Sequence, residues 1–139
     1  MIDISVLTGE RLTYISRAAD MLVLSFGDNI CRNYRGEWLS RYALHCQCAW
    51  RITDGHGKIV LARVDIFSPP EGEDYTLDFD WDVRGNNAFD RKSVEILSGG
   101  EVTVTAARLV NGCDIKLELS NGLRFESSAD SSIEEHWRL

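Results

Sequence analysis

The residues most suited to chemistry or recognition are carboxylates in the middle of the sequence. The acids are Glu71, Glu73, Asp74, Asp78, Asp80 and Asp82. Alternating carboxylates could hold Ca²⁺ or Mg²⁺, but nothing like the glycine turn of an EF-hand accompanies them. With Tyr75 or Trp81 as an aromatic anchor, the same acids could instead dock a basic protein. A third interpretation is a solvated strand face that protects a sheet edge.

A second candidate set is formed by His45, Gln47 and Arg51. In a strand over residues 42–52 these three side chains share the polar face. Polar groups on a central strand must be solvated or hydrogen-bonded, so they are expected to have a defined environment. They could line a concave pocket in which His45 acts as a base, or they could form an internal hydrogen-bond network or a solvated face.

The cysteines offer a third possibility, because Cys46 and Cys48 lie only two residues apart. On a regular strand their Cα atoms would be about 6.6 Å apart. A disulfide between such positions has poor geometry. A zinc site would need further ligands, from Cys31, Cys113 or a histidine, and no metal-binding spacing is present. We therefore expect buried thiols that pack as small hydrophobes, and we predict no metal and no cofactor.

Charge and missing motifs narrow the function classes. The 139 residues include 22 acidic and 15 basic side chains, for a net charge of −7. An acidic surface repels phosphate backbones and favours a basic protein partner, so nucleic-acid binding is not expected. The sequence contains no G-x-S-x-G, no P-loop and no G-x-G-x-x-G after a strand, so no catalytic residue is predicted.

The sequence also makes predictions about location and domain organisation. The first residues, 1–5, have neither the basic nor the apolar segment of a signal peptide. No apolar run approaches the roughly eighteen residues of a membrane span. We expect a cytoplasmic protein with no membrane partner and reduced cysteines, folded as one β-rich domain over residues 1–139. A homo-oligomer is compatible with the sequence.

The element expected to position His45, Gln47 and Arg51 is one long central strand over residues 42–52. At period two, one of its faces is wholly apolar. That face consists of Leu44, Cys46, Cys48, Trp50 and Ile52. The pattern predicts that this row is buried while the opposite row is solvated or hydrogen-bonded.

The remaining elements are mostly strands joined by tight turns. Strands are predicted over residues 12–16, 21–26, 58–67, 102–110, 113–119, 123–126 and 136–139. Asn111-Gly112 and Asn121-Gly122 are strong hairpin signals. Residues 75–83 predict either an edge strand or an extended loop anchored by its aromatic side chains.

A single helix is predicted near residues 87–97, with Asn86 or Asn87 as its N-cap. Its buried side would carry Phe89, Val94 and Leu97. The fold class is therefore mainly β (α+β). We expect an antiparallel meander of about seven or eight strands, curled or barrel-like. An ion pair between Arg17 and Asp20 is expected to pin the first hairpin.

Three segments resemble a family of small uncharacterised bacterial proteins. They are R-A-A-D-M-L-V-L-S-F-G over residues 17–27, Y-A-L-H-C-Q-C-A-W-R-I over residues 42–52, and E-H-W-R-L over residues 135–139. The resemblance spans most of the chain and implies a bacterial cytoplasmic protein. It implies no activity, substrate or catalytic residue, and residues 65–100 take no part in it.

Two functions are compatible with these observations. The first is a non-enzymatic cytoplasmic protein-interaction module, of the kind found as immunity or accessory proteins beside bacterial toxins. It would bind a basic partner through Tyr75, Trp81 and the neighbouring acids. The alternative is a small-molecule-binding or catalytic β-barrel that uses the face carrying His45, Gln47 and Arg51.

Overall fold

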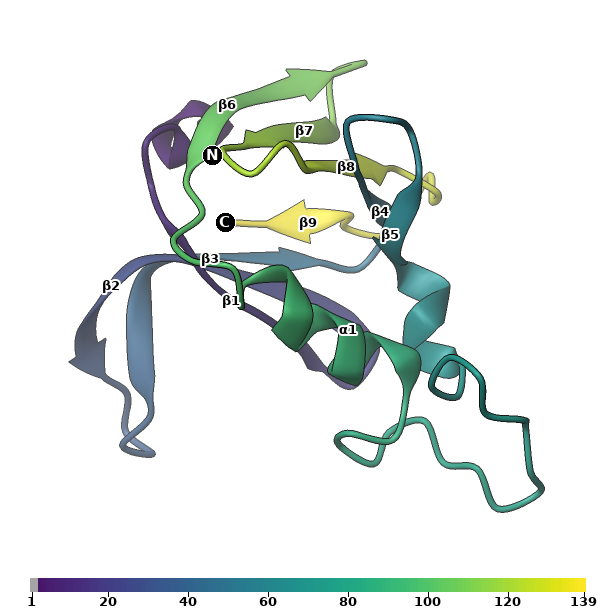
Figure 1. The fold of residues 1–139 in the computed structure, drawn as a ribbon. Coiled ribbons are helices and arrows are strands. Elements are labelled where there is room, and N and C mark those ends of the chain that lie inside the picture. The colour runs from purple at the N-terminus through teal and green to yellow at the C-terminus, as the bar shows by residue number, and fades with distance from the viewer. Residues whose placement is uncertain (1–2) are drawn as a thin grey trace.

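Two antiparallel sheets make up most of the protein, whose computed structural model describes residues 3–139. The first sheet has the order β1-β2-β3-β9 and the second has the order β5-β4-β8-β7-β6 (Figure 1). The first sheet consists of β1 (Leu12–Ala18), β2 (Met21–Arg32), β3 (Trp38–Cys46) and β9 (Trp137–Arg138). The second consists of β4 (Ala49–Thr53), β5 (Ile59–Ala62), β6 (Val104–Val110), β7 (Asp114–Leu119) and β8 (Arg124–Ser128).

Three short helices complete the described part of the chain: η1 (Ile4–Leu7), η2 (Arg63–Phe67) and α1 (Ala88–Ile96). The mainly β prediction is confirmed, with nine strands rather than seven or eight. The expected meander holds within β1-β2-β3 and within β6-β7-β8, but β4 pairs with β8 and β3 with β9. A curled or barrel-like sheet is not confirmed, since the strands of residues 3–139 form no closed barrel.

The two sheets meet where β1 begins. Leu12 N donates to Val102 O at 2.8 Å, and Gly9 N donates to Val104 O at 2.8 Å. An isolated bridge between Arg11 and Thr103 lies in the same place. These contacts connect the edge strands β1 and β6, so residues from both sheets and from α1 contribute to one hydrophobic core.

The prediction of one continuous central strand is wrong. β3 ends at Cys46 and β4 begins at Ala49, and the two strands belong to different sheets. The apolar row is buried throughout as predicted, with Leu44 0% exposed and Trp50 4% exposed. The chain bends at residues 47–48 and crosses from one sheet to the other, while its apolar side chains continue to face the same core.

The predicted strand over residues 58–67 is also too long. β5 ends at Ala62, where the Asp65 side chain accepts a hydrogen bond from Ala62 N at 2.9 Å. That bond caps η2, which takes over from Arg63 onward. Residues 64–67 therefore form part of a 3-10 helix although their apolar pattern resembles a strand. The Asp65 side chain competes with a neighbouring strand for the backbone N–H of Ala62.

The predicted helix is confirmed, and Asn87 is its N-cap, accepting from Asp90 N at 2.7 Å. Its buried face is only partly as expected. Phe89 is buried, but Val94 is 71% exposed and Ser93 is buried in its place. The rotation of α1 is set by its polar contacts with β1, described below, as well as by its apolar pattern.

A substitution at Gly27 tests the backbone conformation of β2 at the place where its register with β3 shifts. Gly27 has φ +80°, and an added Cβ would lie 3.0 Å from both the Arg41 Cβ and a Glu10 carboxylate oxygen. Gly27→Ala is expected to lower the free energy of unfolding by about 2 kcal/mol, since L-residues disfavour the left-handed region. Gly55→Ala is the control, because the Cβ that alanine would add there has open space within 4 Å. Equal denaturation midpoints for the two variants would contradict a requirement for glycine at position 27.

Candidate functional site

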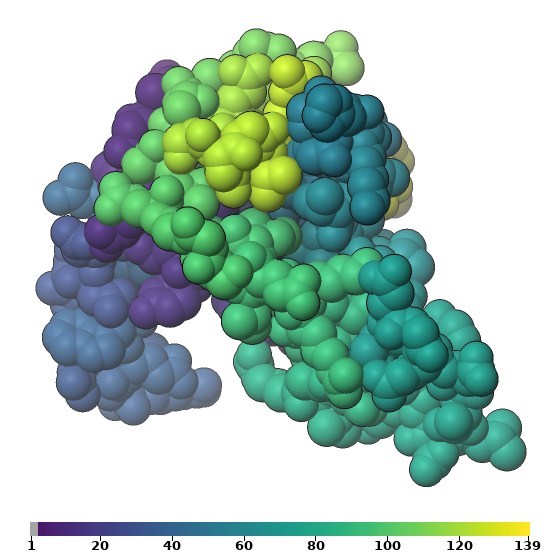
Figure 2. Space-filling model, viewed as in Figure 1, coloured from purple at the N-terminus to yellow at the C-terminus, as the bar shows by residue number. Residues whose placement is uncertain are grey.

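The acidic loop, residues 71–82, connects η2 to α1 and contains no strand. Of the two alternatives predicted for this segment, the structure has the loop. It projects from the body of the protein at the lower right of Figure 1 and forms the teal knob of Figure 2. Leu77 is 109% exposed and Tyr75 is 68% exposed. Both are apolar side chains that the fold leaves in water.

The charges of the acidic loop fall into two groups. Two acids pair with basic residues of α1: Glu71 with Lys92 at 3.5 Å, and Glu73 with Arg91 at 3.1 Å. Asp82 pairs with Arg17 at 3.0 Å. The three remaining acids have no cationic partner among residues 3–139. They are Asp74, Asp78 and Asp80.

Aromatic packing and short hydrogen bonds hold the C-terminal end of the loop. The Trp81 ring packs edge-on against Phe67, with centroids 4.9 Å apart. The Asp80 side chain accepts from Asp82 N at 3.0 Å, and the Asp80 carbonyl accepts from the Asn86 side chain at 2.8 Å. Trp81 is therefore an anchor of the loop to the protein, whereas Tyr75 is an exposed side chain.

Arg17 is the residue that fixes this end of the loop to the sheet. Its side chain is only 3% exposed. It donates to both Asp90 carboxylate oxygens, at 2.8 and 2.9 Å. It also donates to the Asp82 side chain at 3.0 Å and to the carbonyl oxygens of Ala19, Trp81 and Asp82 at 3.0 to 3.3 Å. One guanidinium thus joins β1, the acidic loop and α1.

The expected ion pair between Arg17 and Asp20 is wrong. Arg17 turns inward to satisfy Asp90, and Asp20 lies near Arg63, at 3.6 Å. Burial disfavours a charged Asp90, but hydrogen bonds from Arg17 and Gly85 outweigh it and lower the pKa of Asp90. Asp90 therefore stays ionised, and the bidentate pair is of the strong kind.

His45, Gln47 and Arg51 are divided between the two sheets. His45 is on β3, opposite Arg138 of β9. Gln47 is exposed at the bend and donates to the Asp20 side chain at 3.3 Å. Arg51 is on β4 and pairs with Glu126 at 3.3 Å. The structure does not bring the three together in one hollow, because the strand that was to align them changes sheet after Cys46.

An exposed aromatic arm was not recognised from the sequence. Residues 29–40, the distal part of the β2–β3 hairpin, project from the side opposite the acidic loop, with a hollow between the two in Figure 2. Tyr34 is 90% exposed and Trp38 is 55% exposed. Arg32 stacks over Trp38 at 4.5 Å, and Arg35 lies over Tyr34 at 5.3 Å. The sequence feature that could have indicated this arm is the placing of arginines near aromatic residues around the Arg35-Gly36 turn.

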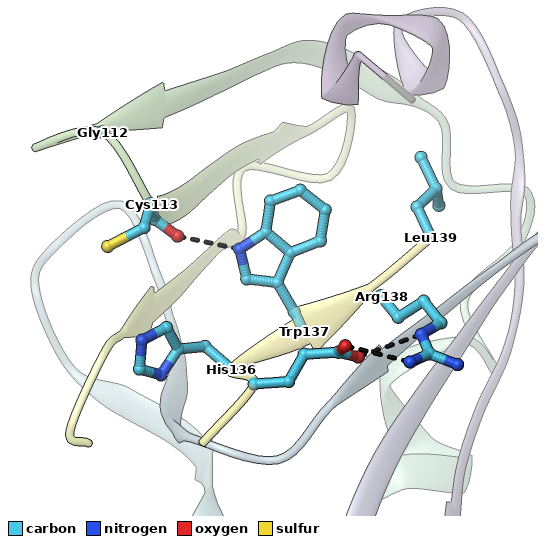
Figure 3. Close-up of a pocket in the computed structure, with 7 residues that line it drawn as sticks. Gly112, Cys113, His136, Trp137, Arg138 and Leu139 are labelled. Atoms are coloured by element: carbon cyan, nitrogen blue, oxygen red, sulfur yellow. Dashed lines mark hydrogen bonds and ion pairs between the residues drawn. The ribbon is translucent and has the colours of Figure 1, made fainter. Parts of the chain in front are cut away.

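A hollow of about 630 Å³ lies beside β9 and the start of β7 (Figure 3). Trp137 and Leu139 are among its lining residues, and its volume is typical of small-molecule sites. Two of its polar contacts are internal: Trp137 Nε1 donates to Cys113 O at 2.8 Å, and Arg138 pairs with Glu135 at 2.9 Å. The hollow therefore has mainly apolar walls, and the His136 side chain is a further polar group in its lining.

Comparisons of this chain with protein-family models, curated proteins and solved structures give no match. Within residues 3–139 no helix has the length and apolar character needed to cross a membrane. In the same range no three His, Cys, Asp or Glu side chains are grouped so as to hold a metal ion.

Proposed function

We propose that this chain is a non-enzymatic protein-interaction module of the immunity or accessory kind, which docks a basic partner protein on its acidic loop. One observation carries the proposal: unpaired carboxylates surround exposed apolar side chains on a loop that is fixed to the fold. Asp74 and Asp78 flank the segment that presents Tyr75 and Leu77, and Asp80 follows two residues later. A cytoplasmic site of action is part of the same proposal.

The two kinds of side chain would play different parts in binding. Carboxylates without a cationic partner among residues 3–139 attract a basic surface and orient it, which raises the association rate. Tyr75 and Leu77 offer apolar area that becomes buried on contact, and buried aromatic anchors dominate binding energy. Tyr75 is already oriented by an edge-on contact with Phe79, with centroids 5.7 Å apart.

The anchoring of the loop also favours affinity. Ordering a flexible segment on binding costs free energy, and a segment held in place beforehand avoids part of that cost. Here Arg17 and Trp81 fix the C-terminal end, and the ion pairs of Glu71 and Glu73 with α1 hold the N-terminal end. The exposed middle of the loop is therefore presented from two fixed points.

Site-specific photo-crosslinking tests the proposal. A photoreactive phenylalanine derivative replaces Leu77 in one variant and Ile133, which is 89% exposed, in a control variant. After irradiation in a lysate of the source organism, we expect one discrete adduct with a basic protein from position 77 and none from position 133. Adducts of the same proteins from both positions, or no adduct from position 77, would count against docking on the acidic loop.

A further inference from the structure

The bend between β3 and β4 brings two thiols together. The Sγ atoms of Cys46 and Cys48 are 3.6 Å apart, and each residue is 1% exposed. On a regular strand the two side chains would stand in parallel, and for that reason no disulfide is expected from the sequence. Because the strand is interrupted at residues 47–48, that geometry does not apply. A disulfide bond is about 2.05 Å long, so forming one here would shorten the Sγ–Sγ distance by about 1.5 Å.

The backbone around the pair is held on both sides of the bend. Gln47 N donates to His136 O at 2.9 Å, next to the two-residue strand β9. Ala49 N donates to the Asp130 side chain at 3.3 Å. The backbone on both sides of the bend is thus fixed by hydrogen bonds to residues 130 and 136, and the core holds the two sulfurs 3.6 Å apart.

The surroundings make the two thiols unequal. The hydrogen bond from Cys46 lowers the pKa of Cys48, although burial opposes this, and the same bond raises the pKa of Cys46. The positive charge of Arg63 acts on Cys46 as well, and Arg63 Nε is buried without a hydrogen-bond partner among the described residues. Cys48 therefore has the greater thiolate character, and the thiolate is the reactive form.

We propose that Cys46 and Cys48 are a reversible dithiol that a peroxide oxidises to an intramolecular disulfide. Cys48 loses its proton and attacks one peroxide oxygen, the O–O bond breaks, and Cys48 sulfenic acid and hydroxide form. The Cys46 sulfur then attacks the sulfenic sulfur, so that the S–S bond forms and the S–O bond breaks. The Cys46 proton leaves with that oxygen as water, and the proton lost by Cys48 converts the hydroxide to water. The two thiols lose two electrons, and the peroxide becomes two water molecules.

Burial of the pair makes the reaction selective for small oxidants. Hydrogen peroxide is close to water in size, whereas an aromatic disulfide reagent is too large for a site that is 1% exposed. Cys31, in contrast, is exposed. In the folded protein we expect the bulky reagent to modify Cys31 and to leave Cys46 and Cys48 unmodified, while hydrogen peroxide oxidises the pair.

The test uses the folded Cys31→Ser/Cys113→Ser variant, in which only the pair remains. After treatment with hydrogen peroxide, alkylation in denaturant and mass spectrometry, we expect most molecules to have lost two hydrogen atoms and both alkylation sites. A thiol reductant should restore both sites. Peptide mapping of the untreated and treated wild-type chain gives the same readout without any substitution.

Single variants separate the two steps. Cys46→Ser should stop at a sulfenic acid on Cys48 that a dione probe traps, and Cys48→Ser should give no such adduct. The proposal is overturned if Cys46 and Cys48 of the folded wild-type chain stay fully alkylatable at a peroxide concentration that oxidises Cys31. Disulfide formation only under denaturing conditions would overturn it equally.

Discussion

Replacing Arg17 by methionine is expected to lower the free energy of unfolding by about 3–5 kcal/mol. Methionine keeps the apolar stem but removes the charge, and Asp90, whose side chain is 12% exposed, then remains buried as an unpaired anion. The carbonyl oxygens of Ala19 and Asp82 also lose their bonds from Arg17, whereas Trp81 O keeps the one that the Asn87 side chain donates at 2.9 Å. Denaturant unfolding followed by circular dichroism measures the loss.

Arg51→Met is the matched control for this prediction. Arg51 also pairs with a carboxylate, at 3.3 Å from Glu126, but its side chain is 55% exposed. Exposed pairs contribute about 0–1 kcal/mol, so this variant should unfold at nearly the wild-type denaturant concentration. Losses of the same size for Arg17→Met and Arg51→Met would show that the Arg17 network does not hold the fold together.

The effect of Arg17→Met should depend on pH in a defined direction. The folded-state pKa of Asp90 is lowered from an ordinary value of 3.8. A carboxyl group with a lowered pKa contributes stability above its unfolded-state pKa, and the contribution is lost as the pH falls through the folded-state pKa. The unfolded-state pKa is common to both chains, and without Arg17 the burial of Asp90 raises its folded-state pKa in the variant. The stability difference should therefore be largest at high pH and should shrink as the pH falls through the pKa of Asp90 in the variant toward that in the wild type.

Much of the fold could be predicted because its signals are local. Asn87 caps α1 through a bond to a residue three positions later, and Asn111-Gly112 turns β6 into β7 with positive φ at both positions. The alternation that buries Leu44 and Trp50 is likewise visible within a few residues. The expectation that the 75–83 segment is extended and anchored by aromatics was sound for Trp81.

The parts that could not be predicted depend on distant partners. Arg17 contacts Asp82 and Asp90, which lie 65 and 73 positions further along the chain. The pairing of β4 with β8 is equally remote, and it draws β4 away from β3 into the other sheet. A period-two pattern specifies which side chains face the core, but it contains no information about which sheet the strand joins.

Reversing two charges of the acidic loop should greatly weaken partner binding. In Asp78→Lys/Asp80→Lys a basic partner meets like charge where it formerly met carboxylates, and such juxtaposition costs several kcal/mol, or roughly a hundredfold or more in affinity. Neither side chain has a cationic partner among residues 3–139. The substitution at Asp80 removes the bond from Asp82 N, but Arg17 and Trp81 still hold this end of the loop, so the fold should be retained. An unchanged circular dichroism spectrum and unfolding midpoint check that the variant is folded.

The control variant, Glu101→Lys/Glu134→Lys, changes the net charge by the same amount outside the acidic loop. It separates a local effect at the loop from a general change in the charge of the protein. Glu134 lies in the segment before β9 and is exposed. Glu101 is exposed as well and has only a long contact with Arg11, at 3.9 Å.

The most direct measurement of docking on the acidic loop is a quantitative pull-down with three baits from one native lysate. The baits are the wild-type chain, the loop variant and the control variant, and mass spectrometry quantifies what each retains. We expect a stoichiometric basic protein on the wild-type and control baits, and at least about tenfold less of it on the loop variant. Equal recovery on all three baits, or no stoichiometric partner on the wild-type chain, would contradict docking on this loop.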